Sequence, residues 1–412
     1  MTWTPELRDY IQRHLLDDTA NLLLTAHRYP DIDVPFAVEQ IEARRRLKEK
    51  LPEWYANPDL VMGGRVPAEQ CSSEQTARYK RSIIEGESLC DMTGGMGVDF
   101  WYMSEGMERA IYTERQSHLC EAARHNFGAL ADGHHPQIEV REGDGRNLPI
   151  PSVDVIYLDP ARRAGNGSRV YAIEDCEPNV LKWQDELLQH ARMVLVKLSP
   201  MVDIKDVLRK LKGVTDVHVV AVKNECKEVL VAAHALRDSL HAECLPTEKM
   251  ERNDVLIHCV DFLTNETIQY SFSLSDEMSV FLTDGGVKRY LYEPDVTLMK
   301  AQAFGSLCAR YPVWQLDVDT HLMTSDELIP DFPGRIFEVE EQIPFSSKML
   351  KRLKREIPQA NIATRNFLLT ADALRKKTGI KDGGEVYLFG AKIKDVGQML
   401  LKCRKKSLPS HP

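Results

Sequence analysis

The stretch Asp91-Met92-Thr93-Gly94-Gly95-Met96-Gly97 decides the fold of this chain. Ser88-Leu89-Cys90 before it is typical of the end of a short buried strand, and a helix is expected from about Val98. A glycine-rich turn lets the backbone pass close to a ligand where a side chain would collide. The start of the following helix adds unpaired N–H groups and a positive dipole end. We therefore expect a strand, a ligand-binding turn and a helix.

Two classes of ligand are bound by such turns, dinucleotides and S-adenosylmethionine (SAM). A dinucleotide-binding turn has the pattern G-x-G-x-x-G. Gly95 and Gly97 supply the first two glycines, but Phe100 occupies the third position. Asp91 instead ends the strand with an acid, as in the D/E-x-G-x-G-x-G loop of SAM-dependent methyltransferases. Thr93 stands at the first glycine of that loop, so the turn favours SAM with one departure.

Two further acids follow strand-like segments at the expected distances. Glu114 ends Arg109–Glu114, 17 residues after Gly97, and can accept hydrogen bonds from both ribose hydroxyls. Asp144 follows the strand around 138–140 and is placed to accept from the adenine amino group. Each acid alone could be a surface turn residue. Their order along alternating strands and helices favours a nucleoside site in an α/β sheet.

The motif Asp159-Pro160-Ala161-Arg162-Arg163 ends an apolar strand that begins at Val153. Such a strand end faces the ligand cleft of an open α/β sheet. A carboxylate and a carbonyl held by proline can bind a planar nitrogen and align its lone pair with a methyl donor. The aromatic residue that would stack on a base is missing here. Arg162 and Arg163 either contact substrate phosphate or form salt bridges with the acidic body.

A helix before the glycine turn is expected to start at Ser72 or Ser73. It carries Thr76, Tyr79 and Lys80 on one face, which we interpret as a wall over the methionine end of SAM. An ordinary amphipathic helix is the alternative.

Composition limits the class of protein. With 412 residues, 43% hydrophobic and 28% charged, the chain should form two or three ordered domains. No apolar run approaches the roughly 20 residues of a membrane span, and no secretory signal is expected, because the first residues have neither a basic start nor an apolar stretch. Nine scattered cysteines never form C-x-x-C, which argues against a metal site and favours reduced thiols in the cytoplasm. Cys226 is interpreted as a buried thiol rather than a nucleophile.

The charge is uneven along the chain. Residues 346–412 hold 16 Lys and Arg against 5 Asp and Glu, a net of +11, whereas the rest holds 37 against 57, a net of −20. A basic end is expected of a nucleic-acid-binding module, although a solvated helical surface is the alternative. We expect a strand at 336–339, a capped helix from Ser346, a helix ending at Gly379, a strand at 385–394 and a final basic helix. The candidate RNA contacts of this module are Lys348, Lys351, Arg352 and Arg355.

Five motifs, at residues 70–74, 91–99, 159–163, 197–200 and 224–228, together resemble bacterial class I SAM-dependent methyltransferases with a C-terminal THUMP-like domain. The resemblance implies that Asp91, Gly95 and Gly97 form the SAM loop, and that Asp159 and Pro160 line the methyl-acceptor pocket. It also implies RNA as the partner, because THUMP-type domains bind RNA.

The predicted fold is a doubly wound Rossmann-like sheet with an N-terminal helical region and C-terminal α+β domains. The expected boundaries are 1–65 for the helices, 66–237 for the methyltransferase domain, 238–330 for a small ferredoxin-like domain and 331–412 for the THUMP-like domain. Residues 255–262 and 267–272 alternate like paired strands.

The predicted function is SAM-dependent methylation of a base nitrogen in tRNA or rRNA. The alternatives are methylation of a protein or small molecule, or a non-catalytic SAM-binding protein that interacts with RNA. No membrane and no metal is expected as a partner. The oligomeric state does not follow from the sequence.

Overall fold

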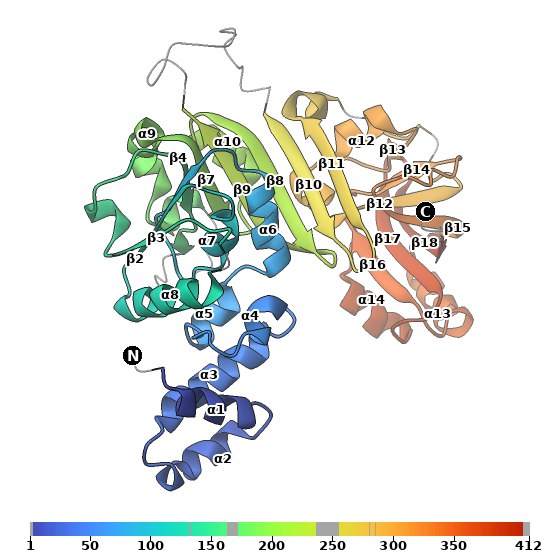
Figure 1. Ribbon diagram of the computed structural model, residues 1–412. Helices are drawn as coiled ribbons and strands as arrows, with labels where there is room; N and C mark the ends of the chain where they lie inside the picture. Colours follow the sequence, from blue (N-terminus) through green and yellow to red (C-terminus); the bar gives the residue numbers. More distant parts are fainter. Residues whose placement is uncertain are drawn as a thin grey trace. The chain divides into compact units, whose positions relative to one another are not determined.

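The computed structural model describes residues 3–131, 133–162, 172–235, 255–279, 281–284 and 286–406. The chain divides into two compact units, Met1–Thr215 with Leu230–Pro246 and Asp216–Val229 with Thr247–Pro412. The ribbon can be followed through both in Figure 1.

A nine-stranded sheet has the order β11-β10-β8-β9-β7-β4-β1-β2-β3. From β7 to β3 all the pairs are parallel. The chain builds outward from β1 to β3 and then returns to β4 and β7 on the other side of β1. A ligand cleft is expected at the carboxyl ends of β1 and β4, where this direction reverses. The bounds are β1 (Ser88–Asp91), β2 (Arg109–Glu114), β3 (Ile138–Glu142), β4 (Val153–Leu158) and β7 (Ala191–Leu198).

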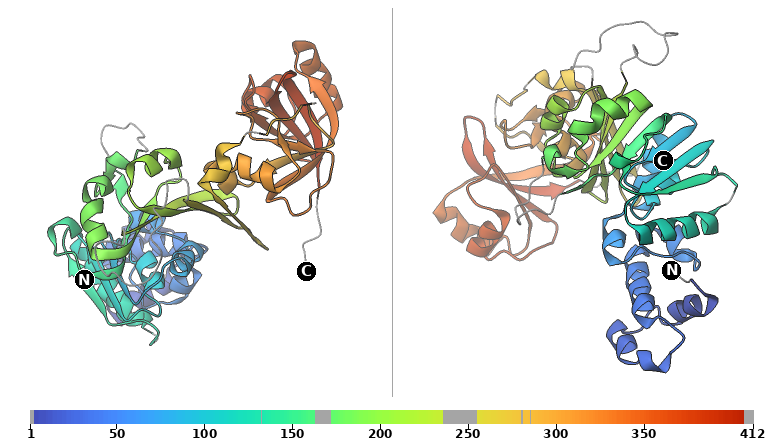
Figure 2. Two further views of the ribbon diagram at one scale, coloured as in Figure 1. Left: turned by 90° about the horizontal axis from the view of Figure 1, so that it is seen from above. Right: turned by 90° about the vertical axis from the view of Figure 1, so that its left-hand side faces the viewer.

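Helices cover both faces of this part of the sheet, α7 and α8 on one face and α9 and α10 on the other (Figures 1 and 2). Strands buried on both faces read as continuous apolar runs, and β4 fits this rule because only Asp154 of its six residues is not fully buried. The doubly wound fold is therefore confirmed. The helices are α6 (Glu74–Ser82), α7 (Val98–Met103), α8 (Ser117–Leu130), α9 (Val180–His190) and α10 (Ile204–Lys210).

The second half of the sheet consists of β8 (Val214–Val222), β9 (Glu225–His234), β10 (Leu256–Phe262) and β11 (Thr267–Ser273). Lys223 and Asn224 both have positive φ, as the tight turn between β8 and β9 requires. The strands β10 and β11 pair antiparallel, as their alternation predicts. They extend the nine-stranded sheet, because β10 also pairs parallel with β8.

The N-terminal helices are α1 (Pro5–Arg13), α2 (Thr19–Leu24), α3 (Val34–Leu47), α4 (Pro52–Ala56) and α5 (Arg65–Gln70). The fully buried Arg44 donates to the carbonyls of Asn57, Pro58 and Leu60, which fixes the segment after α4. Asn126 of α8 then exchanges two 2.7 Å hydrogen bonds with the backbone of Val61. The helical region is thereby attached to the parallel sheet.

A seven-stranded sheet in the second unit has the order β13-β14-β12-β15-β18-β17-β16. The strands are β12 (Tyr290–Pro294), β13 (Trp314–Gln315), β14 (Met323–Ser325), β15 (Gly334–Pro344), β16 (Asn361–Arg365), β17 (Val386–Ile393) and β18 (Gly397–Lys405). The helices are α11 (Val296–Ala301), α12 (Phe304–Arg310), α13 (Ser347–Glu356) and α14 (Ala371–Thr378). Ser346 caps α13 and Gly379 ends α14, both as predicted.

The predicted final basic helix is wrong, because residues 397–405 form the strand β18. This strand lies between β15 and β17, and Leu400, Leu401 and Cys403 are completely buried. Its basic residues pair across the sheet, Lys402 and Arg404 both with Glu340 of β15.

Candidate active site

The turn after β1 contains glycines that serve different purposes. Gly95 and Gly97 have φ of 57° and 81°, the left-handed region that favours glycine. A Cβ at Gly94 would lie 2.2 Å from the ring of Tyr112, so this glycine is required by internal packing. A Cβ at Gly95 would meet only the Thr93 carbonyl oxygen at 3.8 Å. Gly95 therefore faces open space, as a turn that lies against a cofactor needs.

Two of the predicted acids are tied to this turn. Asp91 is buried, and its Oδ1 accepts the Thr93 N–H at 2.8 Å. Burial raises the pKa of Asp91 well above its usual value. Glu114 accepts the N–H of Gly95 at 2.9 Å through Oε2 and that of Gln116 at 2.8 Å through Oε1. Each Glu114 oxygen has a second lone pair, so the carboxylate can still accept from ribose hydroxyls.

Asp144 has a different environment. Its Oδ1 accepts from Arg146 Nε at 3.0 Å and its Oδ2 from Arg146 Nη2 at 2.5 Å. The hydrogen bond from Arg146 lowers the pKa of Asp144. Asp144 is thus an ion-paired carboxylate near the end of β3, and its contact with adenine stays a prediction.

A buried ionic network lies beneath the turn. Asp99 on α7 contacts Lys80 of α6 at 3.1 Å and Lys197 of β7 at 3.4 Å. Ser72 and Tyr157 donate hydrogen bonds of 2.8 Å to the same carboxylate. Burial alone would raise the pKa of Asp99, but the two ammonium groups outweigh it and hold the pKa below its ordinary range. The network therefore contains a permanent carboxylate.

Asp159 connects this network to the surface. Its Oδ2 accepts from Lys197 at 2.5 Å, and 39% of its side chain is exposed. The N–H of Asp159 donates to Thr93 Oγ1 at 2.6 Å. Thr93, the departure from the common SAM loop, thus joins the turn after β1 to the motif after β4. The next residue, Pro160, is buried.

This arrangement leaves one Asp159 oxygen for a ligand. Lys197 holds Oδ2, and Oδ1 has no hydrogen bond among the described residues. A half-exposed carboxylate with one free oxygen can accept from a planar N–H group. The sequence alone assigned no role to Lys197 or Asp99, and it assigned Ser72 only that of a possible helix cap, although each lies inside a motif behind the family resemblance. The signal in the sequence is Lys197, a charged side chain near the carboxyl end of an otherwise apolar strand, where a ligand cleft is expected.

The other predicted site residues lie on α6, on α13, or outside the described part of the chain. Lys80 is completely buried within the network, and Tyr79 is half-buried on α6, whose cap is Ser73 as predicted. Arg352 pairs with Glu341 and Glu356, whereas Arg355 is exposed. The side chains of Arg162, Lys348 and Lys351, and the whole of Arg163, lie outside the described part of the chain.

Burial raises the pKa of Cys226 to about 12, so its thiol stays protonated at neutral pH. Within the described ranges, no group of three or more His, Cys, Asp or Glu side chains is arranged to hold a metal ion. None of the described helices has the length and apolar character of a membrane span.

Known proteins share this architecture. The family model described as THUMP domain-like matches residues 334–405, and one described as a ferredoxin-like domain matches residues 290–333. The chain is 25% identical over 354 residues to an uncharacterized SAM-dependent methyltransferase of Mycobacterium tuberculosis H37Rv, covering 84% of this chain and 89% of the relative. The same values hold for its counterpart in strain CDC 1551.

A crystal structure provides a stronger match. A candidate methyltransferase from Porphyromonas gingivalis W83 is 36% identical to this chain. The two structures superimpose with a TM-score of 0.85. The match covers 99% of this chain and 100% of the other. The turn at Gly95, with Glu114 bound to it, fits SAM as the cofactor. The chain therefore belongs to the class I SAM-dependent methyltransferases that carry a C-terminal THUMP-like domain.

Proposed function

We propose that this methyltransferase modifies a base nitrogen of tRNA or rRNA in the cytoplasm. The observation that carries the proposal is the Asp159 carboxylate, held at Oδ2 by Lys197 and partly exposed. The remaining Asp159 oxygen can accept a hydrogen bond. It therefore suits a methyl acceptor that carries an N–H group, such as the exocyclic amine of a base. SAM, when bound, would supply the methyl group from its sulfonium sulfur, which leaves as a neutral thioether while the acceptor nitrogen releases one proton.

The residues of the chain would act mainly by orientation. The Asp159 carboxylate and the Pro160 carbonyl would hold the acceptor nitrogen with its lone pair directed at the methyl group. Thr93 would fix the distance between the cofactor turn and the acceptor motif, because it bonds to both. Lys197 is the positioning residue for Asp159. Glu114 would bind the ribose hydroxyls.

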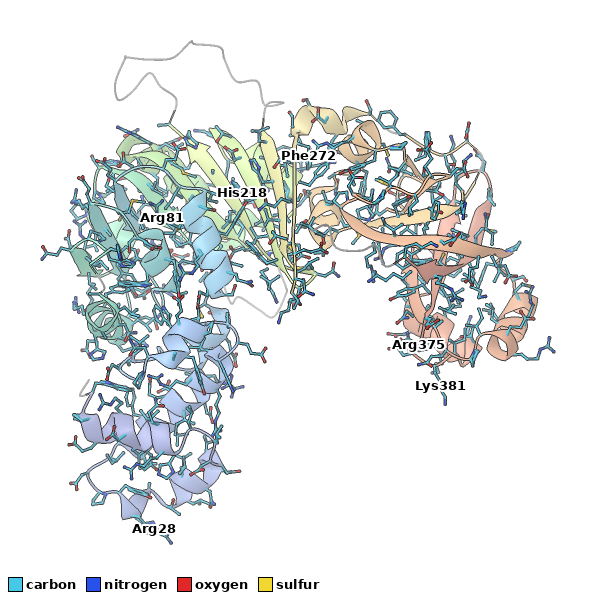
Figure 3. All side chains as sticks on the ribbon, turned by 45° about the vertical axis from the view of Figure 1, so that its right-hand side comes forward. Arg28, Arg81, His218, Phe272, Arg375 and Lys381 are labelled. Atoms are coloured by element: carbon cyan, nitrogen blue, oxygen red, sulfur yellow. The ribbon has the colours of Figure 1, made fainter. Side chains whose placement is uncertain are left out.

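RNA is favoured as the acceptor by the THUMP-like domain and its charge. Residues 334–405 contain 16 Lys and Arg against 8 Asp and Glu. Basic surfaces bind nucleic acid chiefly through backbone phosphates. Figure 3 shows Arg375 and Lys381 at one end of this domain. Arg375 belongs to α14, and Lys381 follows that helix.

The experiment compares acceptor classes. Purified protein and SAM with a tritiated methyl group are offered total RNA, or total protein extract, from a strain that lacks the gene. We expect label in one RNA size class and release of that label as a methylated nucleoside after digestion. Label that appears only in protein would overturn the RNA proposal and make a protein the acceptor.

A further inference from the structure

A buried glutamate in the second unit is shared by two arginines. Glu293 of β12 is 1% exposed. Its Oε2 accepts from Arg335 Nη2, directly opposite it on β15, and its Oε1 accepts from Arg365 Nη2 at 2.8 Å. Arg365 ends β16, and three strands separate β12 from β16 in the sheet order. The curvature of this sheet therefore brings two distant strands to one carboxylate.

The positive charges of this group reach the surface, but its negative charge does not. The side chains of Arg335 and Arg365 are 43% and 31% exposed, whereas the glutamate between them is covered. Among the described residues of this unit, the other carboxylates shared by two basic side chains are partly exposed. Arg289 and Lys406 share Glu338, which is 29% exposed. Among the described residues, neither Arg335 nor Arg365 has a second carboxylate partner.

Both guanidinium groups keep unused donors. A guanidinium has five N–H groups, and each of these arginines gives Glu293 only one nitrogen. Arg365 gives a further bond to the Thr364 carbonyl, and Arg335 lies 5.7 Å from the centre of the Phe337 ring. Because one carboxylate anchors both groups, they are ordered before any ligand arrives, and less side-chain entropy is lost on binding.

Two guanidinium groups that are held in place on partly exposed side chains, and that keep unused donors, match the oxygens of a phosphate. Arginine binds a phosphate through two parallel hydrogen bonds. We propose that Arg335 and Arg365, held by Glu293, form a phosphate clamp for a phosphodiester of the RNA backbone. This inference rests on the proposed function, because it names the contact by which the THUMP-like domain holds its RNA. The clamp would position the RNA and carry no sequence preference.

The competing explanation is that the three residues only hold β12, β15 and β16 together. Substitution by lysine separates the two explanations. Arg365→Lys keeps the positive charge and a hydrogen bond to Glu293, but loses the planar fork that binds phosphate. A structural link would tolerate this change, whereas a phosphate clamp would not. Arg289→Gln is the matched control, since Arg289 is an exposed arginine of the same unit whose partner, Glu338, is only partly buried.

The test measures binding of bulk bacterial tRNA, labelled with fluorescein at its 3′ end, to the full-length protein at several KCl concentrations. Thermal melting shows that each variant is folded. We expect Arg335→Gln and Arg365→Gln each to weaken binding at least about fivefold. Each should also reduce the slope of log K against log [KCl] by a little under one, the loss of about one phosphate contact. Arg365→Lys should weaken binding with the slope unchanged, and Arg289→Gln should bind within about twofold of wild type.

Two results would overturn the clamp and are distinct from failure of the proposed function. If the wild type binds tRNA and both folded glutamine variants bind equally well, the clamp is wrong while the RNA proposal stands. Should the glutamine variants fail to fold, wild-type affinity in folded Arg365→Lys would overturn the clamp in the same way. If the wild type binds neither bulk tRNA nor total rRNA at any salt concentration, neither RNA docking nor the clamp survives.

Discussion

Gly94 and Gly95 are neighbours in the turn after β1, yet a side chain would act differently at each. A methyl group at Gly94 would collide with Tyr112, so Gly94→Ala should cost about 1–3 kcal/mol of folding free energy. Gly95→Ala should cost only about 1 kcal/mol, because its positive φ is strained for alanine but the space is open. Its methyl group would enter the expected cofactor space, and SAM affinity should fall at least about tenfold.

Calorimetric titration with SAM and thermal melting of both variants check this prediction. A Gly95→Ala protein that binds SAM as tightly as the wild type would show that the cofactor lies elsewhere.

Thr93 gives a second prediction for a single residue. Thr93→Val removes the oxygen that accepts the Asp159 N–H and leaves a partly buried donor without its partner, which costs about 1 kcal/mol. Displacement of Asp159 should slow methyl transfer more than it weakens SAM binding. Thr93→Ser restores the oxygen and should recover most of the rate. The rates are measured in a single-turnover transfer assay. Equal rates for the valine and serine variants would show that the Thr93 hydroxyl does not position Asp159.

The contact between β10 and α11 supplies a prediction about pH. Asp261 of β10 is completely buried, accepts the Asn224 N–H and is hydrogen-bonded to Asp295, the cap of α11. Burial and the Asp295 charge raise the pKa of Asp261 to about 7. The folded state therefore holds a proton that the unfolded state loses near pH 4. The free energy of unfolding should thus decrease as pH rises from about 4 to about 7.

Asp261→Asn should remove this decrease, because an amide donates to Asp295 without a proton to lose. The stability of the variant relative to wild type should be greater at pH 8 than at pH 5, as measured by urea unfolding. A relative stability that is the same at both pH values would contradict the shared proton.

Elements with strong local signals were predictable and those set by distant contacts were not. The turn at Gly95, the acid at Glu114 and the motif at Asp159 follow from residue types at fixed spacings. Residues 397–405 are basic and apolar in a pattern that also suits a helix, and only their position between β15 and β17 makes them a strand. An ammonium at the end of an apolar strand marks Lys197 locally, but its pairing with Asp99 depends on a meeting of β7, α6 and α7, which no local pattern encodes.

At the scale of the whole molecule, the ferredoxin-like and THUMP-like segments are not independent in their folding. The strand β12 belongs to the first and pairs with β15 of the second, and both lie in one seven-stranded sheet. Deletion of residues 346–412 would leave β15 without its partner β18. We expect this truncated protein to lose the cooperative thermal transition of the second unit, as measured by circular dichroism. A truncated protein that melts like the full chain would contradict this.

The most direct test of the central claim compares wild type with Asp159→Ala and Asp159→Asn in single-turnover methyl transfer, beside calorimetric titration with SAM. Total RNA from a strain without the gene is the acceptor. If Asp159 orients the acceptor, Asp159→Ala should bind SAM within about twofold of wild type and transfer methyl at least about 100-fold more slowly. Asp159→Asn, which keeps one accepting oxygen, should lie between them. Transfer by Asp159→Ala at the wild-type rate would contradict the account.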